Sequence, residues 1–366
     1  MIAGNRRLRV AMFSYRLPVD RERRGGIERA AHTLADGLAR RGHDVTVLTH
    51  DTKPANASYD VSPLPWERFV STWLGRRATM GYLGNVLAVV PDYGAFDVVV
   101  MHGDSLLAPL IGKPVLRVMH GSALGEARSA TSIGRRLLQY GVYVQELLTA
   151  VCHAGVVAVS ECTTQDNPFI RRVVPHGVDG VTFHPGADAR TPEPSVLFVG
   201  SMNGRKRGRF LLDGFVREVR HRHRNASLTL VGAEGPSHPG VVYLTGMADA
   251  QLAELYRRSW VYASPSTYEG FGLPYLEAMA CGTPVVATRN PGSSEVLRDG
   301  AFGIMPPDSE FAATVSDLLG NERRRAELSS AGLKRAGEFS LDRMLDGYEQ
   351  VLFELTEVHA GTVASV

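Results

Sequence analysis

Short apolar runs alternate with amphipathic segments along the N-terminal half of the chain. Residues 8–14 and 44–49 are apolar runs of strand length, and the stretch from Gly25 to Gly42 between them has the spacing of an amphipathic helix that ends at a glycine. This order of strand, helix and strand predicts a parallel sheet with a right-handed crossover. The pattern predicts further strands in this half at 97–101, 115–119, 155–160 and 173–175. It also predicts one long helix at 134–152.

A polar segment with several prolines, residues 185–194, has the composition of a linker between domains. The alternation then restarts, with strands predicted at 196–199, 227–231, 241–244, 260–264 and 283–288, and helices at 210–222, 250–258 and 273–281. A last helix is predicted at 343–358, and the small polar end that follows it, to Val366, is expected to fray. We therefore expect an α/β fold with two Rossmann-like domains that face a central cleft. The first would be residues 1–185, joined by the C-terminal helix 343–358, and the second residues 195–342.

The overall composition narrows the class of protein. A chain of 366 residues is long enough for two domains, and its formal net charge of +2 gives no indication of nucleic-acid binding. No apolar run is long enough to span a membrane, and the basic start of the chain passes directly into a strand rather than a signal peptide. The three cysteines do not have the spacing of metal ligands. We expect them to be reduced thiols, as in most cytosolic proteins. We expect a cytoplasmic protein.

Residues 265–277 carry the strongest chemical signal in the chain. Glu269 and Glu277 bracket a Gly270-Phe271-Gly272 turn that leads into the predicted helix at 273–281. The start of a helix offers unpaired backbone N–H groups to an anion. Ionised carboxylates accept strong hydrogen bonds from vicinal hydroxyls. A ligand with hydroxyls on both sides of a phosphate, such as a nucleotide sugar, fits this arrangement.

A second candidate is the loop 200–208, which follows the predicted strand 196–199. It contains three consecutive cations, Arg205, Lys206 and Arg207, in a chain that has few lysines. Cations at the carboxyl end of a parallel strand can hold a phosphate. A solvated surface loop is the alternative interpretation of the same residues.

Taken together, these motifs resemble those of the retaining, nucleotide-sugar-dependent glycosyltransferases of family 4, which have the GT-B fold. The resemblance covers nearly the whole length, from Gly25-Gly26 to the final helix, and is most specific at 269–295. It implies that the first domain binds the acceptor and the second the nucleotide sugar. It also implies that Glu269 holds the transferred sugar and Glu277 the ribose hydroxyls, while the N–H groups of Phe271, Gly272 and Leu273 meet the diphosphate.

The resemblance assigns further residues. Lys206 matches a lysine of the family's phosphate loop, whereas Ser201 stands where an arginine is usual. This departure either weakens phosphate binding or transfers the role of the arginine to Arg205 or Arg207. Gly25 and Gly26 would let the first helix approach the diphosphate and acceptor closely. The remaining implied positions are His120 near the reacting carbon, Gly232 and Gly246 at the base pocket, and His102 and Asp104 on the acceptor side. His176 replaces an asparagine of the family in a turn expected to be mainly structural.

No Asp-x-Asp pair occurs in the chain, so we expect a metal-independent enzyme without a cofactor. The expected partners are a nucleotide-sugar donor and a hydroxyl-bearing acceptor; the oligomeric state stays open. Residues 65–77 mix aromatics with arginines, which indicates either an acceptor-side loop or a weak peripheral membrane contact. Residues 132–140 are expected to begin an amphipathic helix with a solvated arginine face.

The predicted function is therefore retaining transfer of a glycosyl group, with Glu269, His120 and Lys206 as the catalytic residues. The arginine-rich, lysine-poor composition indicates a GC-rich, actinobacterium-like source, in which acceptors range from antibiotic aglycones and aminocyclitols to cell-envelope lipids. Because signals for hydrophobic anchoring are weak, the expected acceptor is a small molecule, natural product or aminocyclitol, as in antibiotic biosynthesis. Three alternatives remain: transfer to a lipid-linked cell-envelope acceptor, a sugar-nucleotide epimerase of GT-B architecture, and a non-catalytic sugar-nucleotide binder.

Overall fold

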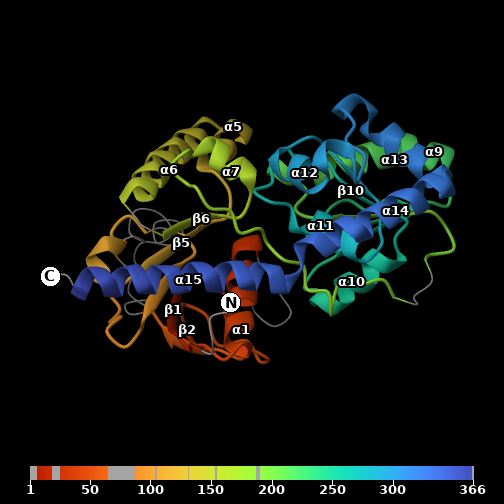
Figure 1. Ribbon diagram of the computed structural model, residues 1–366. Helices are drawn as coiled ribbons and strands as arrows, with labels where there is room; N and C mark the ends of the chain where they lie inside the picture. The colour runs from red at the N-terminus through yellow and green to blue at the C-terminus, as the bar shows by residue number, and fades with distance from the viewer. Residues whose placement is uncertain are drawn as a thin grey trace.

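The computed structural model describes residues 6–18, 25–64, 86, 88–103, 105–130, 132–152, 155–186 and 190–364. Two of the predictions, the segment 65–77 and Asp104, lie outside these residues. Figure 1 shows two α/β halves side by side, with the last helix running from the C-terminal half back across the N-terminal half.

The N-terminal half is built on a six-stranded, wholly parallel sheet with the order β3-β2-β1-β4-β5-β6. Its strands are β1 (Arg9–Phe13), β2 (Asp44–Thr49), β3 (Asp60–Pro63), β4 (Val98–Met101), β5 (Val115–Met119) and β6 (Gly155–Ala158). Its helices are α1 (Gly26–Arg40), η1 (Ala108–Ile111), α5 (Ala123–Ser129), α6 (Ile133–Cys152) and α7 (Glu161–Asp166). This strand order is that of a Rossmann fold, in which the first βαβ unit lies at the centre.

The helical segments η1, α5 and α7 were not predicted, and three strands of this half differ from the sequence predictions. The short edge strand β3 was not predicted, because it is only partly buried and its sequence, Asp-Val-Ser-Pro, lacks an apolar run. The strand predicted at 173–175 is reduced to one bridge between Ala158 and Val173. The strand predicted at 155–160 ends at Ala158, because Ser160 caps α7 instead.

The C-terminal half contains a five-stranded parallel sheet with the order β11-β10-β7-β8-β9. Its strands are β7 (Ser195–Val199), β8 (Ser227–Val231), β9 (Val241–Leu244), β10 (Val261–Ser264) and β11 (Val285–Ala287). The predicted helix 210–222 is α8 (Gly208–Gly214), a π-helical turn η3 (Phe215–Val219) and α9 (Arg220–Arg222). The other helical segments are η2 (Gly204–Lys206), α10 (Asp249–Arg258), α11 (Leu273–Ala280), α12 (Pro291–Val296), η4 (Arg298–Gly300), η5 (Asp308–Glu310), α13 (Phe311–Gly320), α14 (Glu322–Ala336) and η6 (Gly337–Phe339).

The last helix, α15 (Leu341–Ala364), connects the two halves. It packs against α1, β4 and β5, and Arg41 at the end of α1 is ion-paired with Asp346 and Glu349 of α15 at 2.7 Å each. The helix continues to Ala364, six residues beyond the end predicted at 358. A single glycine such as Gly361 weakens a helix without ending it, and alanine has the highest helix propensity of all residues.

The strands β1, β4, β5, β7 and β10 are almost entirely buried, as is typical of parallel sheets covered on both faces, whereas the edge strands β3 and β9 are partly exposed. One cluster of buried apolar residues contains members of both sheets together with α11 and α15. The carboxyl ends of β4 and β5 in one sheet, and of β7 and β8 in the other, are followed by His102, His120, Gly200 and Gly232. The loops at these strand ends form the functional site.

Candidate active site between the two halves

A cavity of about 630 Å³ lies between the two halves and collects most of the predicted site residues. From the N-terminal half it is lined by Gly25, Gly26, Arg29, His120 and His176, and from the C-terminal half by Arg205, Lys206, Gly232, Gly246, Glu269, Gly270, Phe271, Gly272 and Leu273. Strands that come from two separate sheets thus direct their carboxyl ends at one space. This is where a doubly wound α/β fold is expected to bind ligands.

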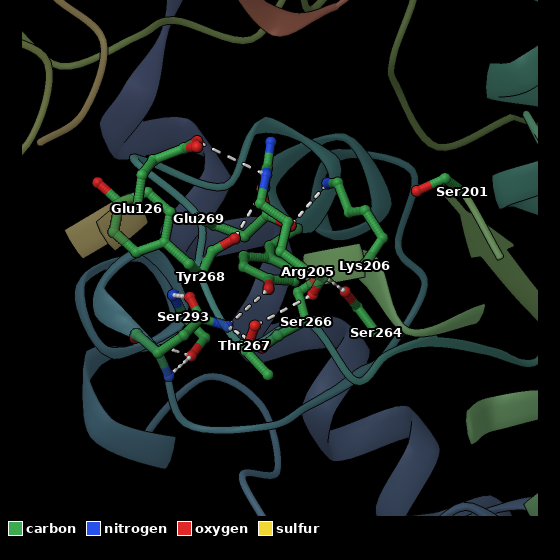
Figure 2. A network of polar contacts seen from close by, with 12 residues as sticks. Glu126, Ser201, Arg205, Lys206, Ser264, Ser266, Thr267, Tyr268, Glu269 and Ser293 are labelled. Carbon is green, nitrogen blue, oxygen red and sulfur yellow. Dashed lines mark hydrogen bonds and ion pairs between the residues drawn. The ribbon is translucent and has the colours of Figure 1, made fainter. Parts of the chain in front are cut away.

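Glu269 is the centre of a charge cluster in this cavity (Figure 2). Its Oε1 accepts a hydrogen bond from Lys206 Nζ at 2.6 Å, and its Oε2 accepts one from Arg205 Nη1 at 2.9 Å. The same Arg205 nitrogen also donates to the Tyr268 carbonyl at 2.7 Å, while its Nε lies 3.8 Å from Glu126 Oε1 of the N-terminal half. Arg205 therefore joins the phosphate loop, the Glu269 loop and the opposite wall of the cavity.

The pKa of the Glu269 carboxyl reflects this environment. The side chain is buried, and burial alone would raise its pKa, but the charges of Lys206 and Arg205 outweigh burial and lower the pKa below its ordinary value. Glu269 is therefore ionised at neutral pH. Lys206, Arg205 and Arg135 together face the two carboxylates of Glu269 and Glu126, so cations exceed carboxylates by one, which suits a negatively charged ligand such as a diphosphate.

The structure separates the two arginines that the sequence left as alternatives. Arg205 lines the cavity, whereas Arg207 is paired with Asp308 through two hydrogen bonds, of 3.1 and 2.7 Å, and does not line it. Ser201 lines the cavity, but its hydroxyl donates to the Asn203 carbonyl within its own loop at 2.9 Å. Of the two candidates, Arg205 is the one placed to take the role of the missing arginine.

The start of α11 supplies the backbone part of the site. Gly272 is the N-cap with φ of 101°, a left-handed conformation that glycine adopts without strain. A Cβ on Gly272 would lie 2.4 Å from the ring of the buried Tyr275, and a Cβ on Gly270 would lie 2.1 Å from the His120 carbonyl oxygen. The Gly-Phe-Gly turn is therefore dictated by close packing as well as by backbone conformation. It places Gly272, Leu273 and Pro274, at the start of α11, on the cavity wall.

Glu277 lies one turn into α11, behind the cavity wall rather than on it. It is 1% exposed, its Oε1 accepts a hydrogen bond from Arg29 Nη1 at 2.7 Å, and its Oε2 accepts one from the Tyr256 hydroxyl at 3.1 Å. Arg29 comes from α1 of the other half and also donates to Asp249 at 3.1 Å. The carboxylate expected to hold ribose is thus engaged across the cleft by an arginine that sequence reasoning did not single out.

Three histidines stack behind the reacting region. The His102 and His120 ring centroids are 5.0 Å apart, and those of His120 and His176 are 5.3 Å apart, with nearly parallel planes. Their ring nitrogens also approach each other, at 2.8 Å from His102 Nδ1 to His120 Nε2 and 3.4 Å from His120 Nδ1 to His176 Nε2. His176 in turn packs edge-on against Phe271 of the glycine-rich turn.

Burial lowers the pKa of all three imidazoles. The pKa falls to about 3 for His102 and to about 4 for His176, and it lies well below the ordinary value for His120, in each case mainly through burial. The positive charge of Arg29 lowers the pKa of His176 further, and that of Arg117 lowers the pKa of His120. The rings are therefore neutral at physiological pH. The stack is consequently a set of hydrogen-bonding groups and not a set of fixed cations.

The predicted acceptor-side residues have different positions. Gly25 and Gly26 line the cavity at the start of α1, and Gly103 lines it in place of its neighbour His102, which is buried behind His120. Asp104 lies outside the described residues. The turn expected to be mainly structural at His176 contributes a ring to the cavity wall instead, because Gly177 packs directly on the start of α15 and thereby holds the turn at the cleft.

The principal residues that the sequence analysis missed are Arg29 and Tyr268. The Tyr268 hydroxyl accepts a hydrogen bond from the Ser122 N–H at 2.7 Å and donates one to the Ser122 carbonyl at 3.0 Å, which connects the halves beside Glu269. Tyr268 directly precedes a residue that the sequence did select, and Arg29 lies one helical turn after Gly25-Gly26. The only sequence signal for Arg29 and Tyr268 was their closeness to residues already assigned to the site. Their partners in the other half, Glu277 and Ser122, are far away in the sequence.

The described residues contain no group of three or more His, Cys, Asp or Glu side chains arranged to hold a metal ion. In the same part of the chain, no helix combines the length and apolar composition that crossing a bilayer requires.

Comparison with known families and structures agrees with this architecture. Residues 24–180 match the family described as Glycosyltransferase Family 4, and residues 193–321 match the family described as Glycosyl transferases group 1. The fold is similar to that of sucrose-phosphate synthase from Thermosynechococcus elongatus, with a TM-score of 0.75 and 20% identity over 98% of this chain and 100% of that one. It is also similar to the Anabaena protein HepE in complex with UDP and glucose, with a TM-score of 0.66 and 15% identity over 98% and 100% of the two chains. These likenesses define a GT-B fold of two Rossmann-like domains. The chain belongs to the family 4, group 1 glycosyltransferases.

Several relatives of this chain that have assigned activities are named as glycosyltransferases. A D-inositol 3-phosphate glycosyltransferase of Segniliparus rotundus is 35% identical over 202 residues, which cover 48% of this chain and 45% of that protein. A second D-inositol 3-phosphate glycosyltransferase, from Corynebacterium jeikeium, is 26% identical over 95% of this chain and 97% of that one. A phosphatidyl-myo-inositol mannosyltransferase of Mycobacterium tuberculosis is 27% identical over 81% and 83% of the two chains. Several of these alignments, the first among them, span only about half of the relative's length.

Proposed function

We propose that this protein is a retaining glycosyltransferase that moves a glycosyl group from a nucleoside-diphosphate sugar to a hydroxyl of a polyol acceptor, without a divalent metal. The observation that carries the proposal is the cluster of Glu269, Arg205 and Lys206 beside the start of α11. These residues come from two loops of one sheet and face a cavity that the other half closes. The names of the related enzymes support an inositol-type acceptor, because they include D-inositol 3-phosphate and phosphatidyl-myo-inositol.

The donor's diphosphate would lie between the start of α11 and the cations of the phosphate loop. Partial positive charge at a helix N-terminus contributes roughly 0.3–2 kcal/mol to binding an anion. Lys206 and Arg205 would then stabilise the negative charge that grows on the departing diphosphate. Glu269 would keep both cations in place before the donor binds and would accept hydrogen bonds from the sugar once it arrives.

The remaining residues would orient the sugar and the ribose. His120 is neutral and ends β5 at the cavity, so it can donate or accept a hydrogen bond with a sugar hydroxyl without adding charge. Glu277 would accept hydrogen bonds from the ribose hydroxyls after Arg29 gives up its Oε1. Attack by the acceptor on the same face from which the diphosphate leaves would retain the anomeric configuration.

Closure of the cleft would keep water from the donor. Three side-chain contacts join the two halves in this structure. They are Tyr268 with Ser122, Arg205 with Glu126, and Arg29 with Glu277. These contacts hold the two walls of the cavity together around the position assigned to the sugar.

A panel of nucleotide sugars tests the donor half of this proposal. Specific binding should raise the melting temperature in proportion to the logarithm of donor concentration, and a Lys206→Ala variant should respond less than Lys334→Ala, a control lysine exposed on α14. If no nucleotide sugar raises the melting temperature, the proposal is wrong.

Product analysis tests the reaction. With donor and inositol-type acceptors, nuclear magnetic resonance of the product should show the donor's anomeric configuration, and EDTA should leave the rate unchanged. Inverted product contradicts the retaining mechanism, and loss of activity in EDTA contradicts the metal-free one. Conversion of the donor to an epimeric nucleotide sugar without acceptor would favour the epimerase alternative.

A further inference from the structure

The closest pair of rings in the histidine stack comes from two neighbouring strands of the N-terminal sheet. His102 follows β4 and His120 follows β5, and these strands pair in parallel. His102 Nδ1 lies 2.8 Å from His120 Nε2, which is the length of a good hydrogen bond. His102 is 3% exposed and does not line the cavity, whereas His120 does. Any effect of His102 on the reaction must therefore pass through His120.

The position of the proton on each ring decides which nitrogen donates. Both rings are neutral because burial lowers their pKa, and a neutral imidazole has one N–H donor and one acceptor nitrogen. In the 2.8 Å contact, either His102 Nδ1–H donates to His120 Nε2, or His120 Nε2–H donates to His102 Nδ1. The first arrangement leaves a donor N–H at His120 Nδ1, and the second leaves an acceptor there.

The far side of His102 selects between these two arrangements. Its Nε2 atom is buried and has no hydrogen-bond partner among the described residues. In the first arrangement this atom is an acceptor without a donor, and in the second it is an N–H group without an acceptor. Proteins leave buried N–H groups without an acceptor less often than they leave acceptors unused. The surroundings of His102 Nε2 therefore favour the first arrangement, in which His102 is the donor.

The other nitrogen of His120 is held less tightly. His120 Nδ1 lies 3.4 Å from His176 Nε2, which is longer than an ordinary hydrogen bond. Both of these rings line the cavity. An oxygen of a bound sugar can therefore replace His176 at His120 Nδ1 at a lower cost than any group could replace His102 at Nε2.

We propose that His102 is a positioning residue that makes His120 a hydrogen-bond donor to the transferred sugar. By donating from Nδ1 to His120 Nε2, His102 fixes the His120 ring and places its single proton on Nδ1. That N–H then meets an oxygen of the sugar in place of His176. This inference rests on the function proposed above and narrows the role of His120 from either donor or acceptor to donor. It also replaces the contact with the acceptor substrate that the sequence assigned to His102.

Nuclear magnetic resonance tests the ring protons without any substrate. Long-range correlation spectra between hydrogen and nitrogen, recorded on the full chain labelled with ¹⁵N at histidine, distinguish a protonated ring nitrogen from an unprotonated one. Comparison with His102→Asn and His120→Asn assigns the two rings. Both His102 and His120 should carry their proton on Nδ1. A proton on Nε2 of His120 would overturn the proposal.

Two substitutions of equal shape test the effect on the reaction. His102→Asn keeps an N–H donor for His120 Nε2, whereas His102→Asp offers only acceptor oxygens when it is ionised. At about pH 8.5, where an imidazole is ordinarily neutral, His102→Asp should move the proton of His120 to Nε2. It should lower kcat at least about tenfold with little change in the KM of the nucleotide sugar, because the diphosphate is held by other residues. His102→Asn should lose less than about threefold in kcat, because the donor is kept.

The matched control is His32→Asn. His32 Nδ1 also lies 2.8 Å from a partner, the Tyr59 hydroxyl, but His32 is not among the residues that line the cavity, so kcat and the His120 spectrum should stay unchanged. Equal losses of kcat in His102→Asn and His102→Asp would show that His102 acts through packing alone and would overturn the proposal. If His102→Asp does not fold, the spectrum of the unchanged protein decides.

The two readouts separate this inference from the function on which it rests. A protein that transfers sugar but carries the His120 proton on Nε2 would refute the role of His102 alone. A protein with the proton on Nδ1 that transfers no sugar from any nucleotide sugar would refute the proposed function.

Discussion

Arg29 and Glu277, residues from opposite halves of the molecule, form a hydrogen-bonded ion pair of 2.7 Å at the back of the cleft. Glu277 is almost completely buried, while Arg29 retains 17% of its side-chain exposure and reaches Asp249 as well. The pair connects the first helix of the N-terminal sheet to the helix that follows the glycine-rich turn. It therefore links the geometry of the donor site to the position of the opposite half.

Arg29→Ala should destabilise the protein. Removing the guanidinium takes away the hydrogen bond of 2.7 Å that Arg29 donates to the buried Glu277 carboxylate, which we expect to cost about 1–3 kcal/mol in the free energy of unfolding. Urea denaturation monitored by circular dichroism measures this. Arg29→Ala/Glu277→Gln should recover part of the loss, because the buried charge is gone.

The matched control for that pair is Arg258→Ala. Arg258 pairs with Glu254 at 3.3 Å, but both side chains are about half exposed, so its loss should change the free energy of unfolding by less than about 1 kcal/mol. Equal effects of the Arg29 and Arg258 substitutions would show that the cross-cleft pair has no special weight.

Lys206→Ala should reduce turnover at least about tenfold, and up to about a thousandfold, because one preorganised group that stabilises developing charge is removed. The circular dichroism spectrum should stay unchanged. Lys334→Ala, on the exposed face of α14, should keep full activity in the same steady-state assay. Unchanged turnover in the Lys206 variant would refute its assigned role.

Gly272→Ala should lower both stability and nucleotide binding. The residue has φ of 101°, and its new Cβ would collide with the buried Tyr275 ring, so we expect a loss of about 1–3 kcal/mol in unfolding free energy. Differential scanning calorimetry and a nucleotide titration measure the two effects. Gly337→Ala is the comparison, because Gly337 has φ of −62° and its Cβ would meet nothing within 4 Å. A Gly272 variant as stable as the Gly337 variant would contradict the argument.

The histidine stack predicts how stability depends on pH. The pKa of His176 is lowered to about 4 in the folded protein, so between about pH 6.5 and 4 the unfolded chain binds a proton that the folded chain does not. Stability should therefore fall as the pH drops through this window, by at most about 1.4 kcal/mol per pH unit for each such histidine.

His176→Asn should make this fall shallower, since asparagine does not titrate and one of the suppressed protonations is removed. Urea unfolding at several pH values within the window measures the slope. His221→Asn, at an exposed position on α9, should leave the slope as it is in the unchanged protein. Identical slopes in all three proteins would show that His176 does not titrate as its burial indicates.

Local sequence signals identified much of this architecture. The alternation of apolar runs with amphipathic segments predicted the strands of both sheets except β3, and the turn from Gly270 to Gly272 was recognisable from its two glycines directly before a helical segment. Such features depend on the residues themselves and on neighbours a few positions away. The edge strand β3 was missed because a half-exposed strand needs no apolar run.

Contacts between distant segments could not be predicted in this way. Nothing in the sequence around Arg29 indicates Glu277 as its partner. His176 was predicted to belong to a turn, and only the structure shows that its ring stacks on His120. Likewise, the segment that begins α6 was expected to carry a solvated arginine face. Only the packing of Glu146 against Ala123 shows that the apolar side of that helix faces outward.

The sequence by itself determined the two parallel α/β sheets, the glycine-rich turn before α11 and the supply of carboxylates and cations for a nucleotide-sugar site. These follow from backbone conformation and from the periodic burial of side chains, both of which are local. The tertiary structure alone decided that Arg205 rather than Arg207 meets Glu269, that Arg29 reaches Glu277, and that one face of α6 remains uncovered. These depend on how separate elements pack together in space, which the spacing of residues along a chain does not specify.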